Sequence, residues 1–133
     1  MTEIVDLNDE LLRQAFDAWD RGHLDTAVHL YERLARLGNS DAMINLANML
    51  DDCVQPRDPL GAIFWYMRGF RYGHQSAAWN LAMHYIPRRN HRWFRFWMVK
   101  AAEMEHENAI VELARIHADP AYMTRLPFED EDA

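Results

Sequence analysis

Nucleophilic side chains are scarce in this sequence. Cys53 is the only cysteine, so no disulfide can form within the chain. It lies next to Asp51 and Asp52, and neighbouring anions disfavour a reactive thiolate. The only serines, Ser40 and Ser76, each precede an expected helix, where a hydroxyl serves as a cap. A nucleophile also needs a base within reach, and no such arrangement is evident, so we expect that the protein is not an enzyme.

The sequence also lacks the patterns of metal and phosphate sites. It has seven histidines, but no pair is spaced i, i+4 with a carboxylate partner, and one cysteine cannot build a structural zinc site. His74 and His106 occupy one repeat position and are expected to be packing or turn residues. A metal site would need His84, His91 and His117 to converge by folding. No glycine-rich phosphate loop is present, so we expect no metal and no cofactor.

Long apolar segments are missing. The longest uninterrupted apolar run spans residues 62–67, which is too short to cross a bilayer. Residues 1–6 are acidic and contain no apolar segment of the kind that a secretory signal needs. We therefore expect a cytoplasmic protein without a membrane partner.

Acidic residues are absent from the middle of the chain. Residues 61–100 hold seven basic residues and no acidic one, whereas residues 1–60 and 101–133 each carry a net charge of −7. In a compact fold such blocks would mix on the surface. In a repeat protein they would stay separate, since each repeat contacts only its neighbours. The middle block would then form a basic belt that orients a charged partner.

What the sequence does contain is a repeat. Residues 42–47 have the sequence Ala-Met-Ile-Asn-Leu-Ala, residues 77–82 Ala-Ala-Trp-Asn-Leu-Ala, and residues 109–114 Ala-Ile-Val-Glu-Leu-Ala. The spacings are 35 and 32 residues, which is typical of arrays of helical hairpins. Apolar residues between these segments recur at spacings of three and four, as in amphipathic helices. The sequence thus predicts an all-α fold of about three and a half hairpins.

The expected organisation is a lead-in at residues 1–8, a repeat domain at residues 9–126 and an acidic tail at residues 127–133. The hairpins should span about residues 9–38, 40–73, 76–105 and 108–126. Ser40 or Asp41 and, further on, Asp58 should cap helices, with a proline at the first turn after Asp58. Glycines at positions 22, 38 and 73 should end helices, because glycine tolerates the left-handed conformation found there.

Two segments resemble a known family. Residues 65–66 and 72–82 (Trp-Tyr, then Tyr-Gly-His-Gln-Ser-Ala-Ala-Trp-Asn-Leu-Ala) and residues 96–106 are similar to the Sel-one-like repeat, a relative of the tetratricopeptide repeat. The resemblance covers roughly residues 10–118, and the first hairpin is closer to an ordinary tetratricopeptide unit. It implies a right-handed α-solenoid that serves as an adaptor for protein–protein contact. It implies no catalytic residues.

In this architecture the first helix of each hairpin lines a concave groove. Repeat alignment places one partner-facing row of side chains at Leu12, Ile44, Trp79 and Val111 and a second row at Phe16, Asn48, Met83 and Arg115, with a rim at Asp9, Asp41, Ser76 and Asn108. Such a mixed apolar and amide surface with an aromatic anchor suits a helix or an extended peptide. The alternative is that some of these apolar side chains are buried between hairpins.

A second candidate surface is basic. It consists of four arginines interleaved with aromatic residues, Arg88, Arg89, Arg92 and Arg95. Basic charge combined with aromatic rings is typical of single-stranded nucleic acid binding. However, Phe94, Trp97 and Met98 fall on core positions of the repeat, and the net acidity of the chain repels phosphate at long range.

The most economical function is a non-enzymatic protein-binding module. Because the chain is small and acidic, the narrower hypothesis is an immunity protein that neutralises a toxin or another partner enzyme. One alternative is a regulatory adaptor or scaffold in bacterial signalling or secretion. A second is an RNA-binding protein that uses the basic patch.

Overall fold

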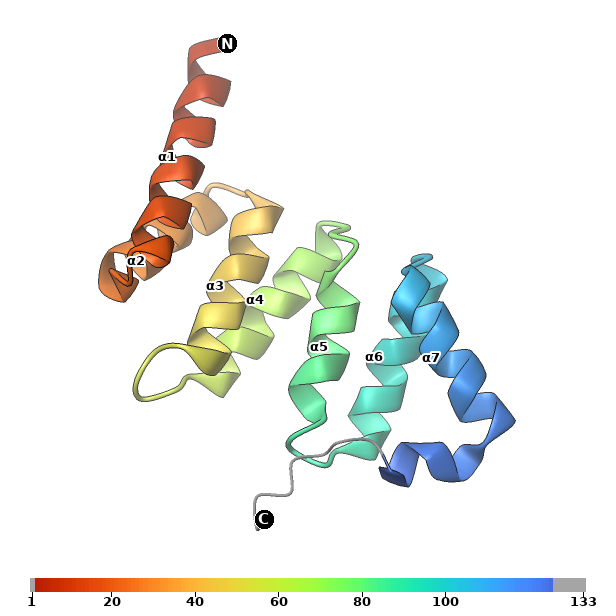
Figure 1. Cartoon of the computed structure of the whole chain (residues 1–133). Coiled ribbons are helices and arrows are strands. Elements are labelled where there is room, and N and C mark those ends of the chain that lie inside the picture. The colour runs from red at the N-terminus through yellow and green to blue at the C-terminus, as the bar shows by residue number, and fades with distance from the viewer. Residues whose placement is uncertain (1, 126–133) are drawn as a thin grey trace. The chain divides into compact units, whose positions relative to one another are not determined.

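The computed structural model describes residues 2–125 of the chain. Over this range the protein consists of seven α-helices and one short 3₁₀ helix, with no strand (Figure 1). The expected all-α class is therefore confirmed. Among these residues, no helix combines the length and apolar character needed to span a membrane. The expected acidic tail at residues 127–133 lies outside the described range.

The chain divides into two units, and the first covers residues 1–72. It contains α1 (Thr2–Asp20), α2 (Leu24–Arg36), α3 (Ser40–Asp52) and α4 (Pro59–Arg71). Each helix packs on the next one along the chain: α1 on α2, α2 on α3 and α3 on α4. The core of this unit combines alanines with larger apolar side chains, of which Leu34, Met43 and Leu46 are the most deeply buried.

The second unit covers residues 73–133. It contains α5 (Ala77–Tyr85), α6 (His91–Glu103), α7 (Glu107–Ala118) and the 3₁₀ helix η1 (Pro120–Arg125). Helix α6 packs on both α5 and α7, and η1 packs on α7. The hydroxyl of Tyr122 in η1 donates a 2.6 Å hydrogen bond to Glu112 Oε2 in α7. The core of this unit is built around Leu81, Phe94 and Met98, all fully buried.

Small side chains recur at buried positions of the first helices. Alanines at equivalent positions of successive first helices are completely buried: Ala15, Ala47 and Ala82 at one position, and Ala42, Ala77 and Ala109 at another. Ala114, the last alanine of the third repeated segment, is exposed. A methyl group keeps helix axes close while still excluding water, and the larger aromatics fill the remaining space. The repeat in the sequence is thus a repeat of packing.

The repeat also recurs in the backbone. Gly38 follows the first hairpin and has a φ of 96°. Glu105 occupies the equivalent position two hairpins later and has a φ of 63°. Both turns carry the same two hydrogen bonds: Gly38 N–H and Asn39 N–H donate to Ala35 and Leu34, while Glu105 N–H and His106 N–H donate to Ala102 and Ala101. This is the Schellman arrangement that ends a helix with a left-handed residue. The glycine stops expected at positions 22, 38 and 73 are confirmed, with φ values of 83°, 96° and 82°.

The first helix begins earlier than expected. We predicted a lead-in at residues 1–8, but α1 already begins at Thr2. No proline or glycine occurs before position 22, so nothing in the local sequence prevents the helix from extending backwards.

Two predicted caps were assigned to the wrong residue. Asn39, not Ser40 or Asp41, caps α3, since Asn39 Oδ1 accepts a 2.9 Å hydrogen bond from Ala42 N–H. Ser76 precedes α5 but its side chain makes no capping bond; its N–H instead donates to His74 Nδ1 at 3.1 Å. A cap requires an extended backbone that aims the side chain at the free N–H groups. Asn39 has that backbone (ψ 109°), whereas Ser76 is helical (ψ −6°).

The expected cap at Asp58 is confirmed. Its Oδ1 accepts a 2.9 Å hydrogen bond from Gly61 N–H, and Pro59 occupies the first turn of α4. A proline fits there because its missing N–H would have had no partner within the helix.

Candidate functional site

Two of the predicted groove residues line one pocket in the first unit. Phe16 from α1 and Asn48 from α3 border a cavity of about 340 Å³. Its other walls come from α1, α2 and α3 and are formed by Trp19, Tyr31, Asn45, Met49, Asp52 and Cys53. The pocket therefore combines aromatic rings with amide groups, which is the character expected for the groove.

Aromatic side chains at the mouth of this pocket are unusually exposed. The side chains of Phe16 and Trp19 are 57% and 44% exposed, and their ring centroids are 6.1 Å apart. Tyr31 of α2 also lines the pocket but is almost fully buried, and this burial raises the pKa of its hydroxyl above the ordinary value. Large exposed rings beside a cavity mark a surface that is suited to a partner.

The amide of Asn48 is held from the neighbouring helix. The hydroxyl of Tyr66 in α4 donates a hydrogen bond to Asn48 Oδ1. Because that bond uses the side-chain oxygen, the amide N–H groups of Asn48 are the atoms that could donate to a partner's carbonyl. Tyr66 itself is buried, so it can hold Asn48 without contacting a partner.

The remaining candidates of the first unit divide by burial. Asp9 is exposed and Leu12 is half-buried, so both can contribute to a surface on α1. Ile44 is only 5% exposed, because α3 turns that side chain into the core. Ile44 therefore belongs to the packing and not to a partner-binding surface.

In the second unit the predicted residues have varied surroundings. Trp79 is half-buried and stacks on His106, with ring centroids 4.9 Å apart and planes within 6°. Met83 is half-buried, whereas Val111 is 51% exposed. Arg115 is exposed and its guanidinium lies 3.4 Å from Glu112 Oε1. One face of the Trp79 ring is thus already covered by an imidazole.

The predicted basic patch separates into two parts. Arg88 and Arg89 belong to the turn before α6; Arg88 donates a 2.6 Å hydrogen bond to the backbone oxygen of His84, and Arg89 has a φ of 55°. Arg92 and Arg95 belong to the first turns of α6 and line a hollow on its surface. This second part borders a cavity.

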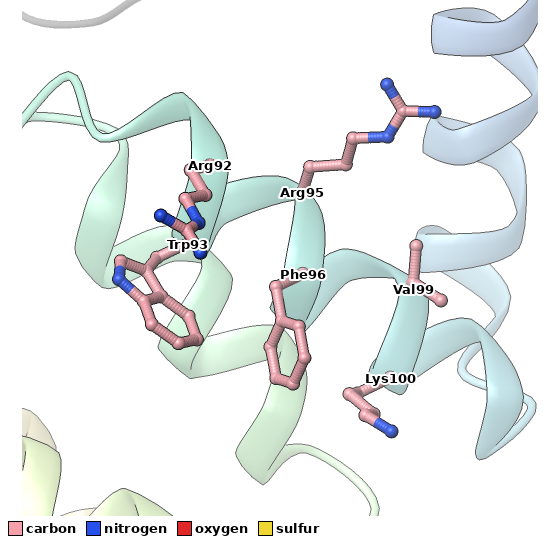
Figure 2. A pocket seen from close by; sticks show the side chains of 6 residues that line it. All are labelled: Arg92, Trp93, Arg95, Phe96, Val99 and Lys100. Atoms are coloured by element: carbon pink, nitrogen blue, oxygen red, sulfur yellow. The ribbon is translucent and has the colours of Figure 1, made fainter.

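The hollow on α6 measures about 520 Å³ and is lined by Arg92, Trp93, Arg95, Phe96, Val99 and Lys100. Figure 2 shows the rings of Trp93 and Phe96 and the amine of Lys100 on one side of the helix, whereas Arg95 extends to the other side. The two rings are 40% and 42% exposed and meet edge to face at 5.1 Å. The hollow is therefore an aromatic surface bordered by cations.

Sequence reasoning missed several of these residues, although their spacing carried a signal. Trp19 follows Phe16 by three residues, and Lys100 follows Phe96 by four. Side chains at such spacings share one helix face.

Within residues 2–125, no group of three or more histidine, cysteine, aspartate or glutamate side chains is arranged to hold a metal ion. Comparisons of the chain with protein-family models, with curated proteins and with solved structures return no match. The class defined by the fold of residues 2–125 is that of an all-α protein in which successive helices pack as hairpins.

Proposed function

We propose that this protein is a non-enzymatic protein-binding module that takes an apolar side chain of its partner into the pocket beside Phe16. The observation that carries the proposal is the exposure of Phe16 and Trp19 at the mouth of a cavity. Exposed rings of this size are costly in water unless a partner covers them. Buried aromatic anchors of this kind supply most of the binding energy at protein interfaces.

The pocket suits a peptide segment of a partner. Its volume of about 340 Å³ is at the small end of ligand cavities, roughly 300–1,000 Å³, which is enough for one or two apolar side chains. The amides of Asn45 and Asn48 supply donors and acceptors that can pair with a peptide backbone. A helix or an extended segment with one apolar anchor would satisfy both features.

The proposal includes a right-handed solenoid of the Sel-one-like type, formed by the stacking of successive hairpins. It is supported by the equivalent buried alanines and by the equivalent left-handed turns at Gly38 and Glu105. In such a fold the first helix of each hairpin would face the partner. Helices α1 and α3, together with Tyr31 of α2, line this pocket.

The narrower form of the proposal is an immunity protein or inhibitor that neutralises a partner enzyme, and it is supported by the small size and net charge of −7. A regulatory adaptor is the alternative. The two are separated by mixing the protein with the bound enzyme: an inhibitor abolishes its turnover at a one-to-one ratio, whereas an adaptor leaves turnover intact.

The pocket is tested by selecting peptides from a random library on the purified protein and measuring their affinities by fluorescence anisotropy. Phe16→Ala should weaken a pocket ligand at least about tenfold, as expected for an anchor. Phe64→Ala is a matched control, because Phe64 is 52% exposed on α4 of the same unit and does not line the pocket. Bound peptide should also shift the NMR signals of the Trp19 indole and the Asn45 and Asn48 amides.

The proposal fails if no selected peptide depends on Phe16, or if the signals of these three residues do not move when peptide is added. Circular dichroism of each variant establishes that the helices are retained, so a loss of binding can be assigned to the pocket.

A further inference from the structure

The surface of α6 carries a compact set of rings and a cation. Phe96 meets Trp97 edge to face, with centroids 5.1 Å apart and planes at 88°, and Lys100 Nζ lies 5.4 Å from the centre of the Phe96 ring. Trp97 is buried and anchors the set in the core, whereas Phe96 is 42% exposed. We call Phe96, Trp97 and Lys100 the α6 aromatic–cation set.

The same set occurs on α4. Phe64 meets Trp65 edge to face at 5.0 Å and 86°, and the guanidinium of Arg68 lies 6.0 Å from the centre of the Phe64 ring. The sequence repeat makes these residues equivalent to Phe96, Trp97 and Lys100, because each residue of the α4 set precedes its counterpart on α6 by 32 positions. A buried core position explains the two tryptophans. It does not explain why an exposed phenylalanine and a cation accompany each of them.

Local charge around the α6 set is positive. Arg92 lies over the ring of Trp93, 5.9 Å from its centre, so cations border the hollow at both ends. No acidic residue occurs between positions 61 and 100. The nearest acid on the helix is Glu103, whose carboxylate lies 3.7 Å from Lys100 Nζ in an exposed pair. Such a pair contributes little, and a partner's carboxylate can replace Glu103 there.

The ring geometry argues against nucleic acid as the occupant. Base stacking needs an open ring face. The Phe96 ring is approached by Lys100 and meets both Trp93 and Trp97 edge to face, and Arg92 lies over Trp93. What remains accessible is an apolar hollow between rings, which fits an aliphatic or aromatic side chain.

We propose that the α6 surface formed by Arg92, Trp93, Phe96 and Lys100 is a second docking site, for an acidic segment of another protein with an apolar anchor. The anchor enters the hollow beside Phe96, and flanking carboxylates pair with Arg92 and Lys100. Carboxylates on both sides of an apolar side chain match cations on both sides of an apolar hollow.

The test is a selection of random peptides on the full chain and on two of its variants. On the wild-type protein one enriched class should combine aspartate or glutamate with a leucine, isoleucine or phenylalanine. Phe96→Ala should weaken the binding of this class of peptides at least about tenfold. Lys100→Glu should also weaken their binding, and by a larger factor at low salt than at high salt, because salt screens the charge interaction. Both changes are at exposed positions, and circular dichroism verifies that the helices persist.

Three controls identify the site. Arg36→Ala removes an exposed cation of α2, outside both proposed sites, and should leave the affinity within about twofold, as for a charge outside an interface. Phe16→Ala should abolish only the peptides of the first pocket, so the two proposals fail separately. Replacing the acids of a selected peptide by asparagine and glutamine should remove its binding to α6.

The inference is overturned if selected peptides are neutral or basic, or if acidic peptides bind Phe96→Ala as well as the wild type. It is also overturned if single-stranded RNA binds through Arg92 and Phe96 while acidic peptides do not. A rise in molecular mass with protein concentration that Lys100→Glu abolishes would instead assign the surface to a second copy of this chain.

Discussion

The hydroxyl of Tyr66 donates a hydrogen bond to Asn48, so that a buried residue of α4 orients an amide of α3 at the rim of the pocket. Tyr66→Phe should lower the free energy of unfolding by about 1 kcal/mol, because the bond is lost from a largely buried site. A double-mutant cycle with Asn48→Ala, measured by urea unfolding, should give a coupling energy of about 0.5–1.5 kcal/mol. Additive effects of the two changes would mean that the bond contributes nothing.

Glu105 occupies a left-handed position that glycine occupies in the equivalent turn. A non-glycine residue costs roughly 1–2 kcal/mol in this conformation. Glycine avoids that cost, but it loses more conformational entropy on folding, which offsets part of the gain in stability. Glu105→Gly should therefore raise the unfolding free energy by about 0.5–1 kcal/mol, as measured by thermal or urea unfolding.

Two matched variants check this explanation of the Glu105 turn. Gly38→Ala should destabilise by about 1 kcal/mol; an added Cβ would lie 3.7 Å from the Tyr72 ring, an ordinary contact, so the cost would be conformational. Glu103→Gly, which removes the same charge inside the last turn of α6, should also destabilise. If Glu105→Gly behaved like Glu103→Gly, the backbone explanation would be wrong.

Asn39 caps α3 through its side-chain oxygen, and Ser40 is the first helical residue. Asn39→Ala should cost about 1 kcal/mol of unfolding free energy, the typical value of a lost cap. Ser40→Ala should change it by no more than about 0.5 kcal/mol, as at an ordinary surface position. Equal effects in urea titrations would show that the serine also contributes a capping bond.

Stability at alkaline pH should depend on Tyr31. Burial raises the pKa of the Tyr31 hydroxyl in the folded state above the ordinary value of about 10. Its contribution to stability is then fully present below about pH 10 and is lost as pH rises through the folded-state pKa. Urea midpoints measured on both sides of that range should fall less for Tyr31→Phe than for the wild type. An identical fall in both proteins would show that Tyr31 ionises freely in the folded state.

Much of the local structure was determined by the sequence alone. Three features depend on neighbours within a few residues: the helix-forming periodicity, the glycine stops at positions 22, 38 and 73, and the cap at Asp58. These features are therefore visible in one dimension. The early start of α1 at Thr2 was missed because no residue marks it, even though nothing local opposes it.

The tertiary structure decided which of these side chains reach the surface. Neighbouring residues on a helix point about 100° apart, so small differences in packing determine whether a side chain is covered. That is why Ile44 is buried while Phe16, predicted for the same groove, is exposed. The pocket beside Phe16 exists only because α1, α2 and α3 meet there. One face of Trp79 is covered by His106, the residue that precedes α7. Sequence periodicity defines the faces of each helix, but the neighbouring helices determine which face is left open.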